Sequence, residues 1–258
     1  MSIMRNRKRN TYVFTGVVIF VLGLSQVVSG QNSQEQKRVA IPEPLMFDLV
    51  RGLGAAKGEL EINALGDFPL NNSSTRGVEW APEIEYALFN NVAVELELPM
   101  NNFEIEAYKM AIQWTIGASK NKKFIHGFQI LAERYVHRNL LELNVLYVPA
   151  YRFNETWSVI GLFGLMIESG KQAANKKKTI VLNASLFADL NERTVVGLEI
   201  NNTDPTFQGL DDNEMMLLLL PQMHYEFEYG YSLQVGAGGK WDDSEVVFSA
   251  VARLIKTF

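Results

Sequence analysis

The sequence predicts an all-β chain that folds as a transmembrane, antiparallel, up-and-down β-barrel of about twelve strands. Three observations support this fold class. Polar and apolar residues alternate with the strand period of two from residue 58 to the end of the chain. The one long apolar run lies at the extreme N-terminus. Short and long connections alternate between the segments, as they do in outer-membrane barrels.

The composition fits a barrel and argues against a helical membrane protein. The chain has 258 residues, of which 47% are hydrophobic and 21% are charged. A bundle of transmembrane helices needs several apolar runs of about 18 residues or more. A barrel keeps its average hydropathy low because outward apolar residues alternate with inward polar ones. The chain has no cysteine, so no disulfide, thiolate metal site or lipidated cysteine is available.

Residues 1–30 have the pattern of a cleaved secretory signal peptide. Arg5, Arg7, Lys8 and Arg9 precede an apolar stretch, and Val28-Ser29-Gly30 supplies small residues for cleavage. A single membrane anchor is the alternative interpretation. Cleavage after Gly30 removes four basic residues and no acidic one, which changes the formal net charge from −5 to −9. An acidic mature chain has no electrostatic reason to bind nucleic acid.

Residues 31–57 are expected to form a periplasmic lead-in segment before the barrel. The segment begins with polar residues and contains Pro42-Glu43-Pro44. Leu45 to Leu53 can form one or two helical turns before the glycines that follow. The outer-membrane barrel itself is expected to span residues 58–258.

Alternation is clear in residues 141–153, where Leu141, Leu143 and Val145 share one face and Glu142 and Asn144 share the other. Residues 215–229 repeat the pattern. Many segments reach 11 residues or more, which matches a tilted strand that crosses the hydrocarbon core. The twelve predicted strands are 58–68, 78–89, 92–99, 104–117, 124–136, 139–153, 156–168, 179–190, 194–202, 213–228, 230–241 and 244–258.

The connections predict how the barrel is oriented in the membrane. Short turns are expected at Asn90-Asn91, Asn154-Glu155, Asn191-Glu192 and Tyr229-Gly230, all after even-numbered strands. Long loops at 69–77, 169–178 and 203–212 follow odd-numbered strands. Periplasmic turns are short and external loops are long, so both termini are expected in the periplasm. The alternatives are a soluble barrel in the periplasm and a soluble β-sandwich with the aromatic residues in its core.

The last strand resembles the C-terminal signal of Gram-negative outer-membrane barrels. Val246, Phe248, Ala250 and Leu254 alternate toward the terminal Phe258, whereas Lys256 departs from the pattern. The resemblance implies an outer-membrane location, contact with outer-membrane lipid, and recognition of Phe258 by the barrel assembly machinery.

Residues 83–99 are similar to the second hairpin of a transporter-like barrel group labelled with the MetA pathway of phenol degradation. That hairpin usually has Tyr-Gly-Leu-Thr-Asp before its turn, and this chain has Tyr86-Ala87-Leu88-Phe89-Asn90. The resemblance covers under a tenth of the chain. It implies an outer-membrane location and passage of hydrophobic or aromatic solutes, and it carries no catalytic residue.

The faces expected to point inward are rich in carboxylates. The predicted acidic residues of the lumen are Glu59, Glu61, Glu79, Glu83, Glu85, Glu95, Glu97, Glu142, Glu199, Glu214, Glu226 and Glu228. The predicted basic residues opposite them are Lys109, Arg152, Lys240 and Arg253. Rings of carboxylates raise the local concentration of cations, so a cation-favouring passage is one hypothesis. A lumen filled by ion pairs and hydrogen bonds is the other.

The predicted function is a passive channel or transporter for a small solute that the sequence does not name. A plugged barrel with a structural or surface-interaction role is the alternative, and an outer-membrane enzyme is the second. No catalytic motif is present, and His126, His137 and His224 are dispersed along the chain. The sequence therefore predicts no enzyme activity, no metal site and no cofactor.

Overall fold

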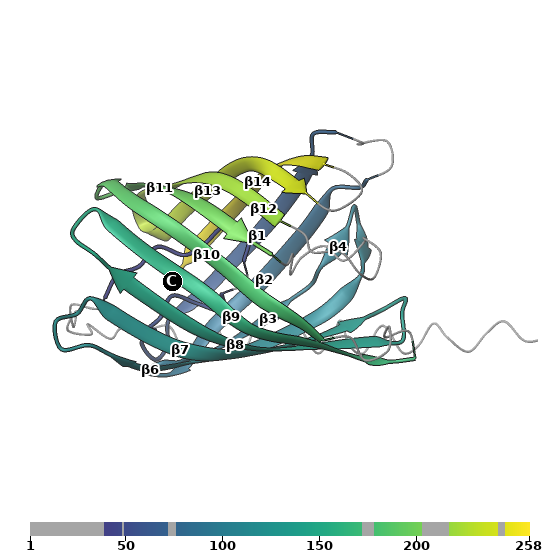
Figure 1. Ribbon diagram of the computed structural model, residues 1–258, viewed down its shortest axis with the longest axis horizontal. Helices are drawn as coiled ribbons and strands as arrows, with labels where there is room; N and C mark the ends of the chain where they lie inside the picture. The colour runs from purple at the N-terminus through teal and green to yellow at the C-terminus, as the bar shows by residue number, and fades with distance from the viewer. Residues whose placement is uncertain (1–38, 48, 72–75, 172–177, 203–216, 242–245) are drawn as a thin grey trace, which may run out of the picture. The chain divides into compact units, whose positions relative to one another are not determined.

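The polarity pattern produces a closed antiparallel barrel of twelve long strands. The computed structural model describes residues 39–47, 49–71, 76–171, 178–202, 217–241 and 246–258. The twelve barrel strands are β1 (Leu60–Pro69), β2 (Glu79–Phe89), β3 (Val92–Glu97), β6 (Ala107–Ala118), β7 (Phe124–Tyr135), β8 (Leu140–Arg152), β9 (Trp157–Gly170), β10 (Lys178–Asn191), β11 (Thr194–Asn201), β12 (Leu217–Glu226), β13 (Tyr231–Trp241) and β14 (Val246–Thr257). They run diagonally across the wall (Figure 1).

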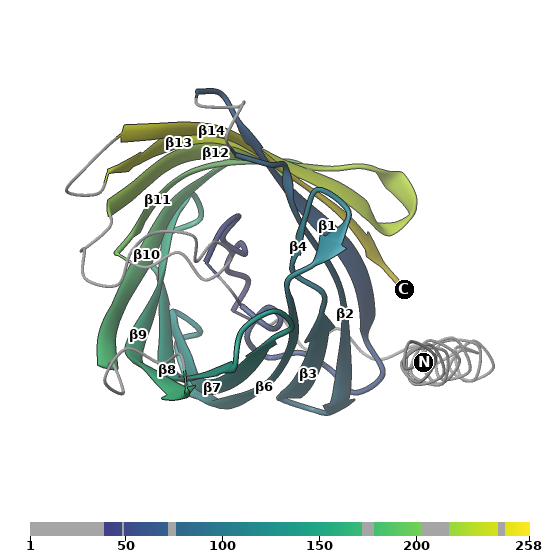
Figure 2. The same cartoon turned by 90° about the vertical axis from the view of Figure 1, so that its right-hand side faces the viewer.

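The sheet closes because the first strand pairs on both of its edges. β1 is antiparallel to β2 on one side and to β14 on the other. Glu61 is opposite Glu85 in β2 and Thr257 in β14. Seen along the barrel, the strands form a ring (Figure 2). Closure leaves no strand edge, which is the condition for a sheet to span a lipid bilayer.

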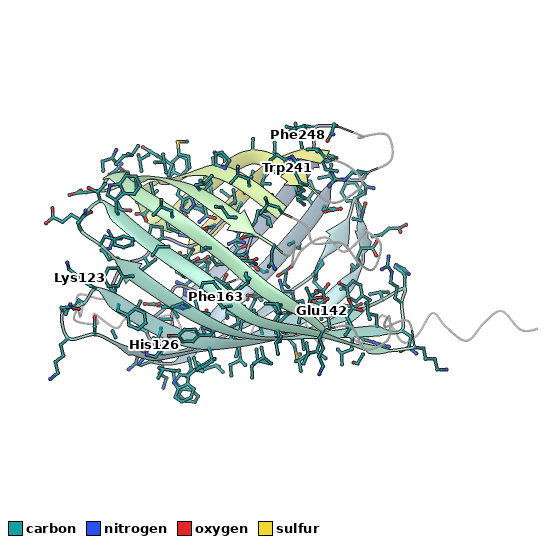
Figure 3. The ribbon with its side chains drawn as sticks, in the orientation of Figure 1. Lys123, His126, Glu142, Phe163, Trp241 and Phe248 are labelled. Carbon is teal, nitrogen blue, oxygen red and sulfur yellow. The ribbon has the colours of Figure 1, made fainter. Side chains whose placement is uncertain are left out.

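Alternation sorts side chains to the two faces of the wall as the sequence predicts. In β8, Leu141, Leu143 and Val145 are exposed on the outer surface, whereas Glu142 and Asn144 are buried inside. In β12, Leu217 and Met223 are exposed, and Gln222 and His224 are buried. Outer aromatic residues such as Trp241 and Phe248 project from neighbouring strands (Figure 3). The apolar side chains therefore face outward, where lipid would lie.

The expected short turns lie at the same rim as the two ends of the barrel. The amide of Phe258 donates to the carbonyl of Leu60, which brings the end of β14 beside the start of β1. Asn91 turns the chain between β2 and β3 with a φ of 69°. Between β12 and β13, a 3-10 turn (Glu228–Gly230) has positive φ angles at Tyr229 and Gly230. We call this rim the turn rim.

The structure adds a small hairpin that the alternation did not predict. β4 (Met100–Asn101) and β5 (Glu104–Ile105) pair with each other, and β4 also pairs with β2. The predicted strand 104–117 therefore begins later, at Ala107, because residues 104–105 belong to the hairpin. Among the described residues, no helix is long and apolar enough to cross a membrane.

The main departure from the sequence analysis concerns the segment before β1. Residues 31–57 were expected to form a periplasmic lead-in segment before the barrel, whereas the described residues between 39 and 54 lie inside the ring (Figure 2). Leu45, Met46, Phe47 and Val50 are at most 1% exposed. The reason is their apolar character, since the barrel interior is where these side chains escape water. We call residues 39–58 the luminal segment.

The assignment of apolar side chains to the lipid-facing surface can be tested by placing a charge there. Val145 lies in the middle of β8 and is 42% exposed. Val145→Arg is expected to destabilise the folded barrel in lipid by about 2–4 kcal/mol, because it places a cation near the bilayer midplane. Urea titration of the barrel in vesicles measures the change.

Tyr151→Arg is the matched control because Tyr151 is on the same face of β8, close to the turn rim. Near the membrane interface the expected destabilisation falls to about 0–1 kcal/mol. Equal effects at the two positions would show that residues 141–151 do not cross the hydrocarbon core.

Candidate functional site

The luminal segment forms a loop that enters and leaves the barrel at the turn rim. Near its beginning, Arg152 Nε in β8 donates to the carbonyl of Ala40 at 2.7 Å. Near its end, the amide of Asn91 donates to the carbonyl of Ala55 at 2.8 Å. Between these points the chain reaches into the interior. The segment is therefore an inserted loop whose two ends lie on the same side.

Glu199 in β11 holds the deepest part of this loop. Its carboxylate accepts hydrogen bonds from three consecutive amides, those of Leu45 (3.0 Å), Met46 (3.1 Å) and Phe47 (2.6 Å). Asn201 Nδ2 (2.7 Å) and Gln222 Nε2 (3.1 Å) donate to the same carboxylate from the wall. Hydrogen bonds to an ionised acceptor are roughly twice as strong as neutral ones. A side chain of the wall thus satisfies backbone groups that have no strand partner.

Other side chains of the wall satisfy three further backbone groups of the loop in the same way. Gln129 Oε1 accepts from the amide of Val50 at 3.2 Å, and Thr115 Oγ1 accepts from the amide of Gly54 at 2.9 Å. Gln113 Nε2 donates to the carbonyl of Arg51 at 2.5 Å. Buried backbone groups need such partners because an unpaired one is costly. These contacts fix the loop without adding it to the sheet.

Apolar side chains of the loop pack against three apolar areas of the inner wall. The largest joins Phe47, Leu49 and Leu53 to the neighbouring strands β7 to β10. Its wall residues are Ile125, Leu146, Val148, Ala150, Ile160, Leu162, Val181 and Phe187. A second area receives Leu45 and Met46. A third packs Val50 against Ala93, Ala111 and Leu131.

Glycine in β13 makes room for the loop. A Cβ atom on Gly236 would lie 3.0 Å from Leu45 Cδ2 and 2.9 Å from the carbonyl oxygen of Pro221. No local pattern in the sequence connects Gly236 with residue 45. The missing side chain lets the loop approach the wall closely.

Arg51 is the buried cation of the luminal segment, and it faces the acidic strands β1 and β2. Its guanidinium binds the Glu61 carboxylate. Arg51 Nη1 lies 3.6 Å from Glu85 Oε2, and Arg51 Nε lies 3.7 Å from Glu59 Oε2. Asn63 Nδ2 donates to Glu85 at 2.9 Å. Arg51 therefore partners carboxylates that share one side of the lumen.

Glu43 is the carboxylate that the luminal segment adds to this group. It accepts a hydrogen bond from the amide of Gly52 at 2.5 Å. Burial, followed by the nearby Glu61 carboxylate, raises the pKa of Glu43 from 4.5 to about 7. Arg51 and Arg253 oppose that rise. Glu43 is thus close to its titration point at neutral pH.

The structure places most of the predicted lumen residues on the inner wall. The buried ones are Glu61, Glu83, Glu85, Glu95, Glu97, Lys109, Glu142, Glu199, Lys240 and Arg253. Glu59, Glu79 and Arg152 are partly buried, and Arg152 binds Asp189 at 2.7 Å. Lys240 binds Asp67 at 2.9 Å.

Two predicted acidic residues lie away from the inner wall, and a third is outside the described residues. Glu226 is exposed at the end of β12, where it lines a cavity at the turn rim. Glu228 was expected in the lumen, but it lies exposed in the turn and is 3.7 Å from Arg193. The reason is that β12 ends at Glu226, so the alternation no longer applies. Glu214 lies outside the described residues.

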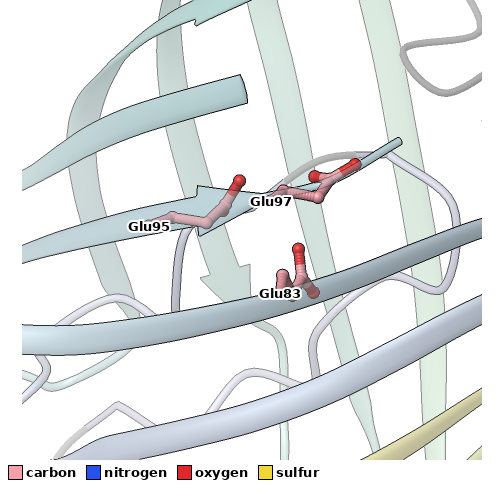
Figure 4. Close-up of side chains that lie close together, drawn as sticks. All are labelled: Glu83, Glu95 and Glu97. Atoms are coloured by element: carbon pink, nitrogen blue, oxygen red, sulfur yellow. The ribbon is translucent and has the colours of Figure 1, made fainter. Parts of the chain in front are cut away.

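Glu83, Glu95 and Glu97 bring their carboxylate oxygens within 4.8 Å of one another (Figure 4). Such a group resembles a cation site. Lys109 lies at the same place, since its Nζ binds Glu97 and is 3.9 Å from Glu95. The lysine ammonium therefore supplies positive charge that a metal ion would otherwise provide.

Two cavities of very different size border the luminal segment. A cavity of about 460 Å³ lies on the side of the turn rim, lined by Glu43, Arg51, Arg152 and His224 among others. A second cavity, which Met46 and Lys109 line, has only about 10 Å³. Among the described residues, the luminal segment thus lines both cavities and occupies part of the barrel interior.

His224 faces the larger cavity but is held by amides. Its Nε2 is 2.8 Å from Gln222 Oε1, and its Nδ1 is 3.5 Å from Gln234 Nε2. A catalytic histidine is ordinarily placed beside a nucleophile and oriented by a carboxylate. The observed partners of His224 position the ring and do not form such a set.

Comparison with known proteins identifies the family. The profile of the HAEPLYID-like family matches residues 37–257. The chain belongs to the HAEPLYID-like family. Read as one-letter residue codes, the eight letters of this name agree with residues 41–48 at Glu43, Pro44, Leu45 and Asp48. The match does not support the resemblance to the MetA-pathway group, which rested on one short hairpin.

Solved structures with a similar fold are outer-membrane channels. The COG4313 outer membrane channel from Pseudomonas putida F1 is 12% identical, with a TM-score of 0.57, over 85% of this chain and 100% of that one. The KdgM porin in complex with disordered oligogalacturonate is 9% identical, with a TM-score of 0.55, over 75% and 97% of the two chains. The NanC porin is 8% identical, with a TM-score of 0.55, over 75% and 98%. A search of the curated proteins finds no match.

The role of Glu199 can be tested with a cysteine in the luminal segment. The chain has no native cysteine, so Met46→Cys gives a single thiol at a position that is 1% exposed. Adding Glu199→Ala removes the acceptor of three amides, and each buried unsatisfied group costs about 1–3 kcal/mol. The rate of maleimide labelling is expected to rise by about tenfold or more, since about 1.4 kcal/mol corresponds to a factor of ten.

Glu199→Gln keeps one carbonyl acceptor and is expected to give a smaller increase. Glu142→Gln is the control, because Glu142 is buried on the wall and accepts a hydrogen bond from Asn144 there. Its labelling rate should equal that of the parent. An unchanged rate in Glu199→Ala would show that the carboxylate does not hold the loop.

Glu43 predicts a dependence of stability on pH. Its folded-state pKa of about 7 is raised from 4.5, so protonation favours the folded chain. The contribution is fully present below pH 4.5 and is lost as the pH rises through about 7. Glu43→Gln keeps this position neutral. Its thermal unfolding midpoint should equal the parent value at pH 4 and exceed it at pH 8, and a constant difference across this range would contradict the assignment.

Proposed function

We propose that this chain is an outer-membrane channel for small solutes whose closed state is the one observed, with the luminal segment as the gate. The observation that carries the proposal is the path of that segment. Its two ends lie at the same rim, and side chains of the wall hold it, so it can leave the lumen without breaking the sheet. The fold that this chain shares with outer-membrane porins supports the location and the transport role.

The charges on the wall favour cations. Among the described residues, the buried polar side chains include ten carboxylates but only four lysines or arginines. One of the four is Arg51, which leaves with the luminal segment. A lumen with excess carboxylate raises the local cation concentration and repels anions. The KdgM porin was solved with oligogalacturonate, a chain of acidic sugars, and we infer that the present barrel does not favour such an anion.

A permanently closed barrel with a structural or surface-interaction role is the second candidate. The three apolar areas and the hydrogen bonds of Glu199 favour it, because they stabilise the loop in place. The two candidates differ in one property, which is whether the luminal segment leaves the lumen under working conditions.

The orientation proposed for the barrel places the turn rim and both ends of the mature chain in the periplasm. The connections at that rim have at most five residues, whereas several at the other rim, among them 70–78, 98–106 and 171–177, have seven or more, and this difference supports the orientation. Phe258 at the end of β14 would then meet the barrel assembly machinery from the periplasmic side. The apolar outer surface would contact outer-membrane lipid, and no enzyme activity is proposed.

Conductance across planar bilayers tests the channel. The parent chain is expected to show rare openings, and Glu199→Ala is expected to raise the open probability at least several-fold, with currents that select for cations. For the locked form, Val50→Cys is paired with Ala111→Cys, since both residues belong to one buried cluster. The oxidised pair should be silent and should recover after reduction.

Glu142→Gln serves again as the control and should behave like the parent. Silence in Glu199→Ala, combined with the accelerated labelling of Met46→Cys, would mean that a displaced loop opens no path. That result would overturn the channel and favour the structural role.

A further inference from the structure

The luminal segment presents two kinds of chemistry to two different parts of the wall. Its Arg51 guanidinium lies among the carboxylates of Glu59, Glu61 and Glu85 on β1 and β2. Its apolar residues Phe47, Leu49 and Leu53 pack on strands β7 to β10. The surface that the segment covers is therefore amphipathic, with an acidic part and an apolar part.

We infer that this surface is a binding site for an amphipathic organic cation. In the observed structure, Arg51 and its apolar neighbours occupy this site in place of the ligand. A ligand of this class competes with the luminal segment and opens the barrel. The inference rests on the proposed channel and specifies its substrate class.

The ligand needs a cationic group because the luminal segment, when it moves away, leaves carboxylates on the wall. Glu61 and Glu85 are 4% and 1% exposed. When Arg51 moves away, these side chains lose a cation that faces them, and buried charges require partners. An ammonium or guanidinium group replaces the missing charge. A neutral or anionic molecule of the same size does not.

The ligand needs an apolar group because the inner wall of β7 to β10 is apolar. Channels for polar solutes have polar interiors. Here Leu146, Val148, Ile160 and Leu162 form one continuous inward area, and each is at most 3% exposed beneath the loop. Water would cover this area if the loop left alone. A ligand with an apolar group keeps it dry and recovers part of the hydrophobic stabilisation.

The spacing within the loop limits the length of the ligand. Arg51 contacts the acidic strands, and Leu53 contacts the apolar wall only two residues later. Two residues of extended chain span at most about 7 Å. The Arg51 and Leu53 side chains add to this backbone span, so a ligand that reaches both parts needs an alkyl chain between its cationic group and its apolar ring. The compound 4-phenylbutylammonium has this form, and 4-phenylbutanol and 4-phenylbutyrate are its neutral and anionic counterparts.

Cysteine labelling distinguishes these ligands on the folded, full-length mature chain in detergent. The reporter is Met46→Cys, because Met46 belongs to a different apolar cluster from Phe47, Leu49 and Leu53. The 4-phenylbutylammonium ion is expected to raise the labelling rate at least several-fold with a saturable dose dependence. The alcohol and the carboxylate are expected to leave it unchanged.

The double variant Glu61→Gln/Glu85→Gln should lose the response, and Glu142→Gln should keep it. Val50→Cys is a second reporter, in a third cluster, if Met46→Cys does not fold. No acceleration by the ammonium ion, or an equal acceleration by the alcohol, overturns the cation site. A response that survives in the double variant overturns the assignment to Glu61 and Glu85.

The same reagents separate this inference from the proposed channel. If Glu199→Ala conducts but 4-phenylbutylammonium affects neither labelling nor current, the cation site is wrong and the channel stands. If Glu199→Ala is silent while the ammonium ion still accelerates labelling, the channel is wrong and the binding site stands.

Discussion

The pairing of β1 with β14 is the constraint on which the rest of the structure depends. It joins the first strand to the last, so every long strand has a neighbour on each side. In a hydrocarbon environment an unpaired strand edge is excluded, because its amides and carbonyls would find no water. Once the ring is closed, the period of two sends every second side chain into an enclosed space. The interior must then be filled, hydrated or partnered.

In this barrel the luminal segment, which precedes β1 in the chain, occupies part of the interior. Strand-forming residues supply the wall, and the loop supplies apolar volume and one buried cation. The backbone of the loop has no strand partner, so the wall provides one carboxylate and several amide and hydroxyl groups at matching positions. The polar residues of the lumen are thus of two kinds, those that hold the loop and those that balance one another, such as Lys240 with Asp67.

The strands were predictable because their signal is local. Alternation and turn residues placed β8 within one residue at each end and assigned Glu142 and Leu143 to the correct faces. The loop was not predictable because Leu45 to Leu53 has no strand period and its partners are far away in sequence, as Glu199 is from Phe47. One sign was available. Residues 45–53 contain six apolar residues and a single arginine, which is unusual in a periplasmic lead-in segment.

The attachment of the loop to β1 has a kinetic consequence. Gly58 lies two residues before this strand, and its amide donates to the carbonyl of Ala87 in β2 at 2.9 Å. The loop is therefore tethered within a few residues of the wall. After any departure it remains at a high effective concentration near its own docking surface. Re-entry of the loop is then a first-order process, independent of protein concentration. A diffusing ligand must compete with a loop that stays tethered beside the same surface.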